Sequence, residues 1–190
     1  MHHLKAARSS RVLAGLTTGL LAAGLLTACG SGKTKVSPPP SSSPSPTASP
    51  SPSDAADRAA VLDAYTHFWD EQVKALAQGS ADGTDLEKYS TGKAAGDVRI
   101  SIVNFRDRGV TFLGAPKHTA QVESIDVKSS PKTATIRDCL DVTDWKPVDK
   151  KTGQPKKVTN RLRYIAVYNA RTVGTDWQMT DVTRHQDQPC

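Results

Sequence analysis

Asp138 is the acidic side chain whose place in the sequence points most directly to chemistry. Residues 132–143 alternate between apolar and polar side chains, and Asp138 has the same parity as Ile136 and Leu140. A strand would therefore turn these three side chains to one face. A carboxylate on an apolar face costs free energy unless it is paired or protonated. Asp138 is thus either a general base in a pocket or, as we favour, a structural acid bonded to arginine or backbone N–H groups.

Several aromatic side chains could act with Asp138 if it were a general base. A tyrosine hydroxyl among them could donate a hydrogen bond to an oxyanion. Arg99 and Arg163 could instead neutralise the carboxylate. The candidate catalytic residues are Asp138, Tyr65 and Tyr164, with Tyr89 and His67 as further companions.

Cys139 and Cys190 are expected to form a disulfide, because an even pair of cysteines in an exported domain is most simply paired. Free thiols are the alternative. We expect no metal site, since the sequence has no Cys-x-x-Cys and its histidines lie on separate segments. No phosphate-binding loop or nucleotide motif is present, so we expect no cofactor.

The first 29 residues have the pattern of an export signal that ends in a lipidated cysteine. Lys5, Arg8 and Arg11 precede an apolar run at 12–26, which is short for a transmembrane helix. The string Leu26-Thr27-Ala28-Cys29 follows and resembles the lipobox of bacterial lipoproteins. That resemblance implies that residues 1–28 are removed and that Cys29 carries a diacylglyceryl anchor on the extracytoplasmic face of the cell membrane. An unanchored secreted protein is the alternative.

Residues 29–53 join this cysteine to the rest of the chain. They are mostly Ser, Pro, Gly and Thr, a composition that cannot bury enough apolar surface to fold, so we predict a disordered linker. The first 53 residues carry five of the 25 basic residues and no acid, which leaves 20 basic and 19 acidic residues beyond them. A nearly neutral domain gives no reason to expect nucleic-acid binding.

Residues 54–190 form one predicted domain, with helices first and strands afterwards. Helical spacing of apolar residues predicts helices over 54–78 and 91–108. Thr84 and Glu87, in the register of a capping box, predict a short helical turn over 84–89. Alternation predicts strands over 110–114, 118–128, 132–143, 158–168 and 176–184, with a bulge at 123–124. The lysine-rich segment 146–157 is predicted to be a solvated hairpin loop. This order indicates an α+β fold with helices packed on one antiparallel sheet of four to five strands.

The same order resembles the nuclear-transport-factor-2-like family, which has a cystatin-like cone fold. The local features that carry the resemblance are Tyr65 with Phe68-Trp69, the string 89–92 (Tyr-Ser-Thr-Gly), and Asp138-Cys139. The chain looks especially like actinobacterial lipoproteins that carry such a domain behind a Ser/Pro stalk. The resemblance implies helices across a curved sheet that encloses a conical pocket. A different α+β sheet and a lumazine-binding-like barrel are the alternative folds.

These features favour a lipid-anchored, extracytoplasmic, non-enzymatic domain that binds a small ligand or an envelope protein. One alternative is an enzyme of the isomerase or cyclase type, as in branches of the resembled family, with Asp138 as base. The other is a structural accessory of a membrane complex. An enzyme needs Asp138 and a tyrosine in one open pocket, whereas a binding domain needs only an apolar cavity.

Overall fold

The structure is a computed structural model that describes residues 52–190, with side chains from residue 54 onward. The predicted signal peptide, Cys29 and all but the last two residues of the predicted linker lie outside the described residues. Within 52–190, helices precede strands. The helices are α1 (Pro52–Gln78), α2 (Leu86–Tyr89) and α3 (Gly92–Asp107). The strands are β1 (Val110–Leu113), β2 (Ala120–Asp126), β3 (Thr133–Asp141), β4 (Lys146–Asp149), β5 (Arg163–Val173) and β6 (Asp176–His185).

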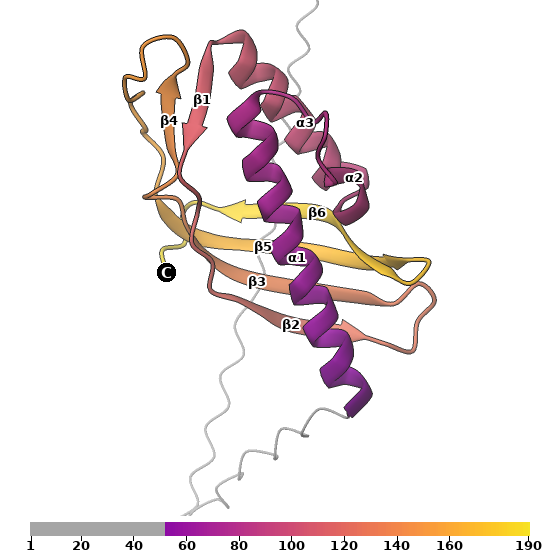
Figure 1. The fold of residues 1–190 in the computed structure, drawn as a ribbon. Helices are drawn as coiled ribbons and strands as arrows, with labels where there is room; N and C mark the ends of the chain where they lie inside the picture. The colour runs from indigo at the N-terminus through magenta and orange to yellow at the C-terminus, as the bar shows by residue number, and fades with distance from the viewer. Residues whose placement is uncertain (1–51) are drawn as a thin grey trace, which may run out of the picture. The chain divides into compact units, whose positions relative to one another are not determined.

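The strands form two antiparallel sheets. Four of them make a sheet in the order β2-β3-β5-β6, and β1 pairs with β4 in a separate two-stranded sheet. α1 crosses one face of the four-stranded sheet, and the β1–β4 pair stands near one end of it (Figure 1). Helices packed on one face of an antiparallel sheet define an α+β fold, so the predicted fold class is confirmed.

The hydrophobic core lies between α1 and the four-stranded sheet. Side chains of β3 are buried at every second residue from Ala134 to Leu140, as the alternation predicts. α1 contributes aromatic side chains to the same layer, and the rings of Tyr65 and Phe68 lie 4.9 and 6.1 Å from the ring of Tyr168 on β5. Aromatic side chains therefore fill the space beneath the middle of α1, where the resemblance implies an open conical pocket.

The prediction of a single sheet and of a plain loop at 146–157 is wrong in part. β4 lies inside that segment and pairs with β1, so that Phe112 is opposite Pro147. This pairing buries Phe112 and Val148. The partner of β4 lies some 36 residues earlier in the chain, and local alternation carries no signal of such a distant pairing. The next strand, β5, begins at Arg163, five residues later than predicted.

Two helix starts also differ from the prediction. α1 begins at Pro52, so Asp54 lies in its first turn, and proline is well tolerated there because the first N–H groups have no partner inside the helix. The predicted capping box of α2 is wrong: Asp85 is the N-cap and makes no side-chain capping bond. The hydroxyl of Thr84 instead donates to the carbonyl oxygen of Ala81 and so closes the turn that precedes α2.

The predicted disulfide is confirmed. Cys139 and Cys190 are bonded, with their Cα atoms 5.7 Å apart and 51 positions apart in sequence. Cys139 alternates with the inward-facing residues of β3, so its sulfur lies on the face of the sheet away from α1. Disulfides persist in oxidising compartments, so this bond indicates a domain that works outside the cytoplasm.

Candidate functional site

The carboxylate of Asp138 is fully buried beneath α1 and accepts hydrogen bonds on both oxygens. Oδ2 accepts from the hydroxyl of Tyr65 at 2.8 Å and lies 2.8 Å from Nδ1 of His118. Oδ1 accepts from the backbone N–H of Thr119 at 2.7 Å. These three groups supply what a buried carboxylate needs in place of water, so the expectation of backbone bonding is met.

Tyr65 links α1 to this carboxylate. Its hydroxyl donates to Asp138 and accepts a hydrogen bond of 2.8 Å from Nε1 of Trp69, one helical turn later on α1. Burial raises the pKa of Tyr65 well above its usual value, and the neighbouring Tyr168 and Asp138 raise it further. The hydroxyl therefore stays protonated and acts as a donor to Asp138 at any pH near neutrality.

His118 is the partner of Asp138 that the sequence analysis missed. Its ring lies against Trp69 at a centroid distance of 4.9 Å and edge-on to Tyr65 at 5.6 Å. The His118 side chain is 25% exposed, so its ring lies between the buried carboxylate and the solvent. The alternation of β2, extended back from its first residue Ala120, could have indicated this contact. His118 and Ala120 point to the same face of the sheet, and Ala120 lies opposite Asp138 on β3.

The loop that carries His118 is held at both ends. Gly114 has φ of +77°, and a Cβ at this position would lie 2.1 Å from the carbonyl oxygen of Asp144, so only glycine fits. Nearer the histidine, Lys117 exchanges two backbone hydrogen bonds with Asp141 at 2.8 and 2.9 Å. The end of β3 therefore positions the loop and sets His118 beside the carboxylate.

His67 and Tyr89 do not reach Asp138. Their rings stack on each other at 5.0 Å with an interplanar angle of 21°, and His67 lies 3.8 Å from Asp63 on the exposed side of α1. Both are candidate companions of Asp138 in the sequence, although His67 is expected on the side of its helix opposite Phe68. Side chains two residues apart on a helix point about 200° apart around its axis, so His67 lies on the outside when Tyr65 faces the sheet.

Tyr164 and the two candidate arginines also have other partners. Tyr164 is buried and faces the same side of the sheet as Asp138, but its hydroxyl interacts with Gln186 and Arg184; burial raises its pKa. Arg99 pairs with Glu87, and Arg163 lies 3.5 Å from Asp141. Neither Arg99 nor Arg163 therefore pairs with Asp138; the groups bonded to it are His118, Tyr65 and the backbone N–H of Thr119.

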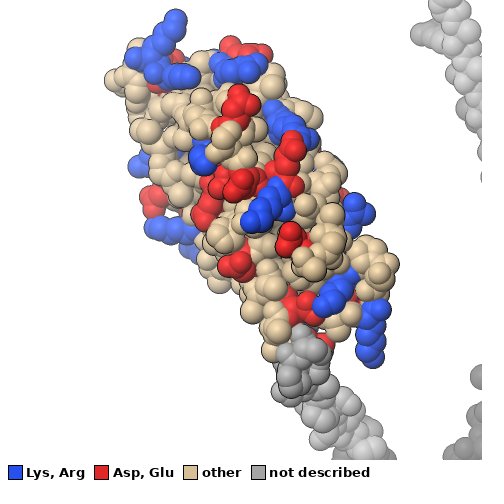
Figure 2. Space-filling model, turned by 45° about the vertical axis from the view of Figure 1, so that its right-hand side comes forward, with Lys and Arg blue, Asp and Glu red and all other residues tan. Residues whose placement is uncertain are grey.

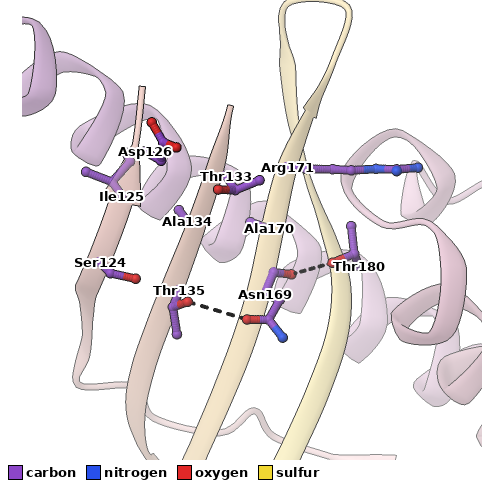
Figure 3. A pocket seen from close by; sticks show the side chains of 10 residues that line it. All are labelled: Ser124, Ile125, Asp126, Thr133, Ala134, Thr135, Asn169, Ala170, Arg171 and Thr180. Atoms are coloured by element: carbon purple, nitrogen blue, oxygen red, sulfur yellow. Dashed lines mark hydrogen bonds between the residues drawn. The ribbon is translucent and has the colours of Figure 1, made fainter. Parts of the chain in front are cut away.

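Two cavities lie away from this network. One, of about 420 Å³, is a shallow hollow on the face of the sheet turned away from the helices (Figure 3). Its polar side chains bond to one another: Thr135 donates to Asn169 Oδ1 at 3.4 Å, and Thr180 donates to the carbonyl oxygen of Asn169 at 3.1 Å. The lining of this hollow includes no aromatic side chain.

The second cavity, of about 330 Å³, lies between the β1–β4 sheet and the segment that leads into β5. We call it the Trp145 groove. Its apolar part consists of Phe105, Phe112, Val142, Trp145 and Leu162. Its basic part consists of Lys157 and Arg161. Tyr164 also lines it, so the structure associates this predicted site residue with the groove.

Charges elsewhere on the domain are mixed. Lysine and arginine side chains lie among aspartate and glutamate side chains over the face drawn in Figure 2. The described residues include no group of three or more His, Cys, Asp or Glu side chains that could hold a metal ion. No helix within residues 52–190 has the length and apolar character needed to cross a membrane.

Comparisons with known proteins add a distant likeness. No protein-family model matches the chain, and no curated protein matches it. Among solved structures, the chain is similar to the crystal structure of the intermembrane space region of the chloroplast protein ARC6, with 11% sequence identity and a TM-score of 0.42. The match covers 70% of this chain and 98% of that one. The resemblance to nuclear-transport-factor-2-like lipoproteins stays a prediction.

Proposed function

We propose that this protein is a lipid-anchored, extracytoplasmic, non-enzymatic domain that binds a small ligand in the Trp145 groove. The observation that carries the proposal is the groove itself, an open hollow of about 330 Å³ lined by aromatic, aliphatic and polar side chains. That volume lies within the range of about 300–1,000 Å³ for small-molecule sites, which are mostly apolar with a few polar groups. The groove combines aromatic side chains with two cations and a tyrosine.

The bonding of Asp138 supports a non-enzymatic role. A general base must be within reach of substrate, whereas Asp138 is fully buried and its oxygens lie within hydrogen-bond distance of three protein groups. The aromatic core covers the carboxylate from the side of α1. The isomerase- or cyclase-type alternative would need a substrate to displace Tyr65 or His118.

Three features support the proposed location. The string that ends at Cys29 resembles a lipobox, and two acyl chains suffice for stable membrane attachment. The disulfide fits an oxidising compartment. The likeness in element order to actinobacterial lipoproteins with a nuclear-transport-factor-2-like domain agrees with the same location.

Membrane fractionation tests the anchor. Cys29→Ala should move the protein from the membrane fraction to the soluble fraction, because the thiol that carries the lipid is gone. Thr27→Ala is the matched control, since alanine fits the motif at that position and the protein should stay in the membrane. A Cys29→Ala protein that is cut normally and remains in the membrane would refute the anchor.

A neutral fluorescent probe, N-phenyl-1-naphthylamine, tests the groove. We expect saturable binding to the chain from residue 30 onward, which contains all described residues and lacks only the anchor. Val158→Trp should weaken binding by filling the groove, because Val158 lines it and is 45% exposed. Val173→Trp is the control, because Val173 is 46% exposed and does not line the groove. Equal binding by the two variants would contradict the proposal.

A further inference from the structure

The apolar part of the Trp145 groove is built from aromatic rings in contact. Phe112 lies between Phe105 and Trp145, with ring centroids 4.8 Å apart in both pairs. The first pair is edge-on at 83° and the second is tilted at 35°. Such rings favour a flat apolar partner that can stack or meet them edge-on.

Trp145 also has an unsatisfied donor. Its indole nitrogen is buried and has no hydrogen-bond acceptor among the described residues. A buried donor without an acceptor is costly, and most buried polar groups are paired. Because the nitrogen itself is closed to solvent, a ligand oxygen could accept from it only after the indole shifts toward the groove that Trp145 lines.

The cations of the groove are not held in ion pairs. No ion pair within residues 54–190 includes Lys157 or Arg161. Asp141, Asp144 and Asp149, the acids nearest to Lys157 along the chain, are paired with Arg163, Lys117 and Lys156. Asp187 follows Gln186, to which Arg161 is bonded, but it forms no ion pair with either cation, so both remain available to an anionic group.

Arg161 is held in place while part of its guanidinium stays free. Its Nε donates to the backbone carbonyl oxygen of Gln186 at 2.8 Å. Its two terminal nitrogens make no hydrogen bond to the described residues. A guanidinium that is positioned through one nitrogen can offer the others to an anionic group.

From these observations we propose that the Trp145 groove binds a small organic anion with a flat apolar body, such as an aromatic carboxylate or sulfonate. The ring system lies against Phe112 and Trp145, and the anionic group meets Lys157 and Arg161. This inference rests on the proposed function and names its ligand class. The ligand is a free molecule rather than a membrane lipid, because a volume of about 330 Å³ is small for two acyl chains.

Paired probes test the charge requirement on the chain from residue 30 onward. The anionic probe is 8-anilino-1-naphthalenesulfonate, and the neutral probe of similar shape is N-phenyl-1-naphthylamine. Lys157→Gln with Arg161→Gln should weaken binding of the anionic probe about three- to tenfold, as expected for two partly exposed cations. Binding of the neutral probe should change less than about twofold.

The matched control is Lys150→Gln with Lys151→Gln. It removes the same charge from the same chain segment, at exposed residues that do not line the groove. The anionic probe should bind this control like the wild type, and thermal unfolding of both double variants should confirm that they are folded. If the two double variants bind the anionic probe equally, the inference is overturned.

Further outcomes separate the inference from the proposed function. Suppose that the neutral probe binds saturably and that binding of the anionic probe does not depend on Lys157 and Arg161. The inference of an anionic ligand would then be refuted, while the proposed ligand site in the groove would stand. Absence of binding by both probes would refute both. Vesicles of phosphatidylglycerol test the lipid alternative: cosedimentation that requires Lys157 and Arg161 would overturn the assignment to a free anion.

Discussion

The hydroxyl of Tyr65 on α1 lies 2.8 Å from Oδ2 of Asp138 on β3, although the two residues are 73 positions apart in sequence. The bond fixes the middle of α1 to the centre of the sheet. Trp69 on the same helix donates to the tyrosine oxygen, and His118 lies against the same carboxylate oxygen. The buried acid therefore organises contacts among α1, β3 and the loop before β2.

Replacing Asp138 should destabilise the domain. Asp138→Asn puts an amide N–H₂ group where an acceptor oxygen now meets a donor, which leaves at least one buried group unpaired. We expect the free energy of unfolding to fall by roughly 1 to 3 kcal/mol, measured by urea denaturation. Asp176→Asn, at an exposed position on β6, should change it by less than about 0.5 kcal/mol. A neutral effect of Asp138→Asn would show that the network does not stabilise the fold.

The bond between Tyr65 and Asp138 can be isolated with a double-mutant cycle. We expect a coupling free energy of about 0.5 to 3 kcal/mol between Tyr65→Phe and Asp138→Asn, because each change removes one end of the same bond. Tyr89→Phe serves as control: its ring stacks on His67 and does not reach Asp138, so its coupling to Asp138→Asn should be near zero. Equal coupling in both cycles would argue against a specific bond.

The disulfide should contribute substantially to stability. It closes a long loop, with a sequence separation of 51, and the chain-entropy argument gives up to about 4 kcal/mol. Cys139→Ala with Cys190→Ala should lower the free energy of unfolding toward that amount. Adding reductant should bring the wild type to a similar value and leave the double variant unchanged. A digest of the wild type without reductant should contain the two cysteine peptides joined.

Stability should fall at alkaline pH because of the buried tyrosines. Burial raises the pKa of Tyr65, Tyr164 and Tyr168 in the folded state, whereas an unfolded chain releases these protons near pH 10. The stabilisation is therefore complete below about pH 10 and is lost as the pH rises above it. Each titrating group contributes a slope of up to about 1.36 kcal/mol per pH unit.

Unfolding free energies measured from pH 8 to pH 11 check this dependence. Tyr168→Phe should reduce the alkaline slope, because phenylalanine has no proton to release. An unchanged slope in that variant would mean that Tyr168 titrates in the folded state as it does in the unfolded chain.

The sequence predicted those features that depend on local periodicity. Alternation in β3 placed Asp138 among apolar residues, and the change of parity in β2 predicted the bulge that lies between Val122 and Ser124. Helical spacing gave the two long helices with ends correct to within two residues. The presence of two cysteines in a domain predicted to be exported was enough to predict the disulfide. The strand and helix signals arise because side-chain direction repeats every two or 3.6 residues.

Features that depend on long-range pairing required the tertiary structure. His118 reaches Asp138 because the register of β2 on β3 and the close approach of Gly114 to Asp144 set its loop. β4 exists because β1 is beside it.

The Trp145 groove has the same origin, since α3, the β1–β4 sheet and the segment before β5 all line it. By itself the sequence determined which faces are apolar, which acid is buried and which cysteines pair. Tertiary structure alone decided the partners of that acid and the position of the groove, because contacts between distant segments leave no periodic trace in the chain.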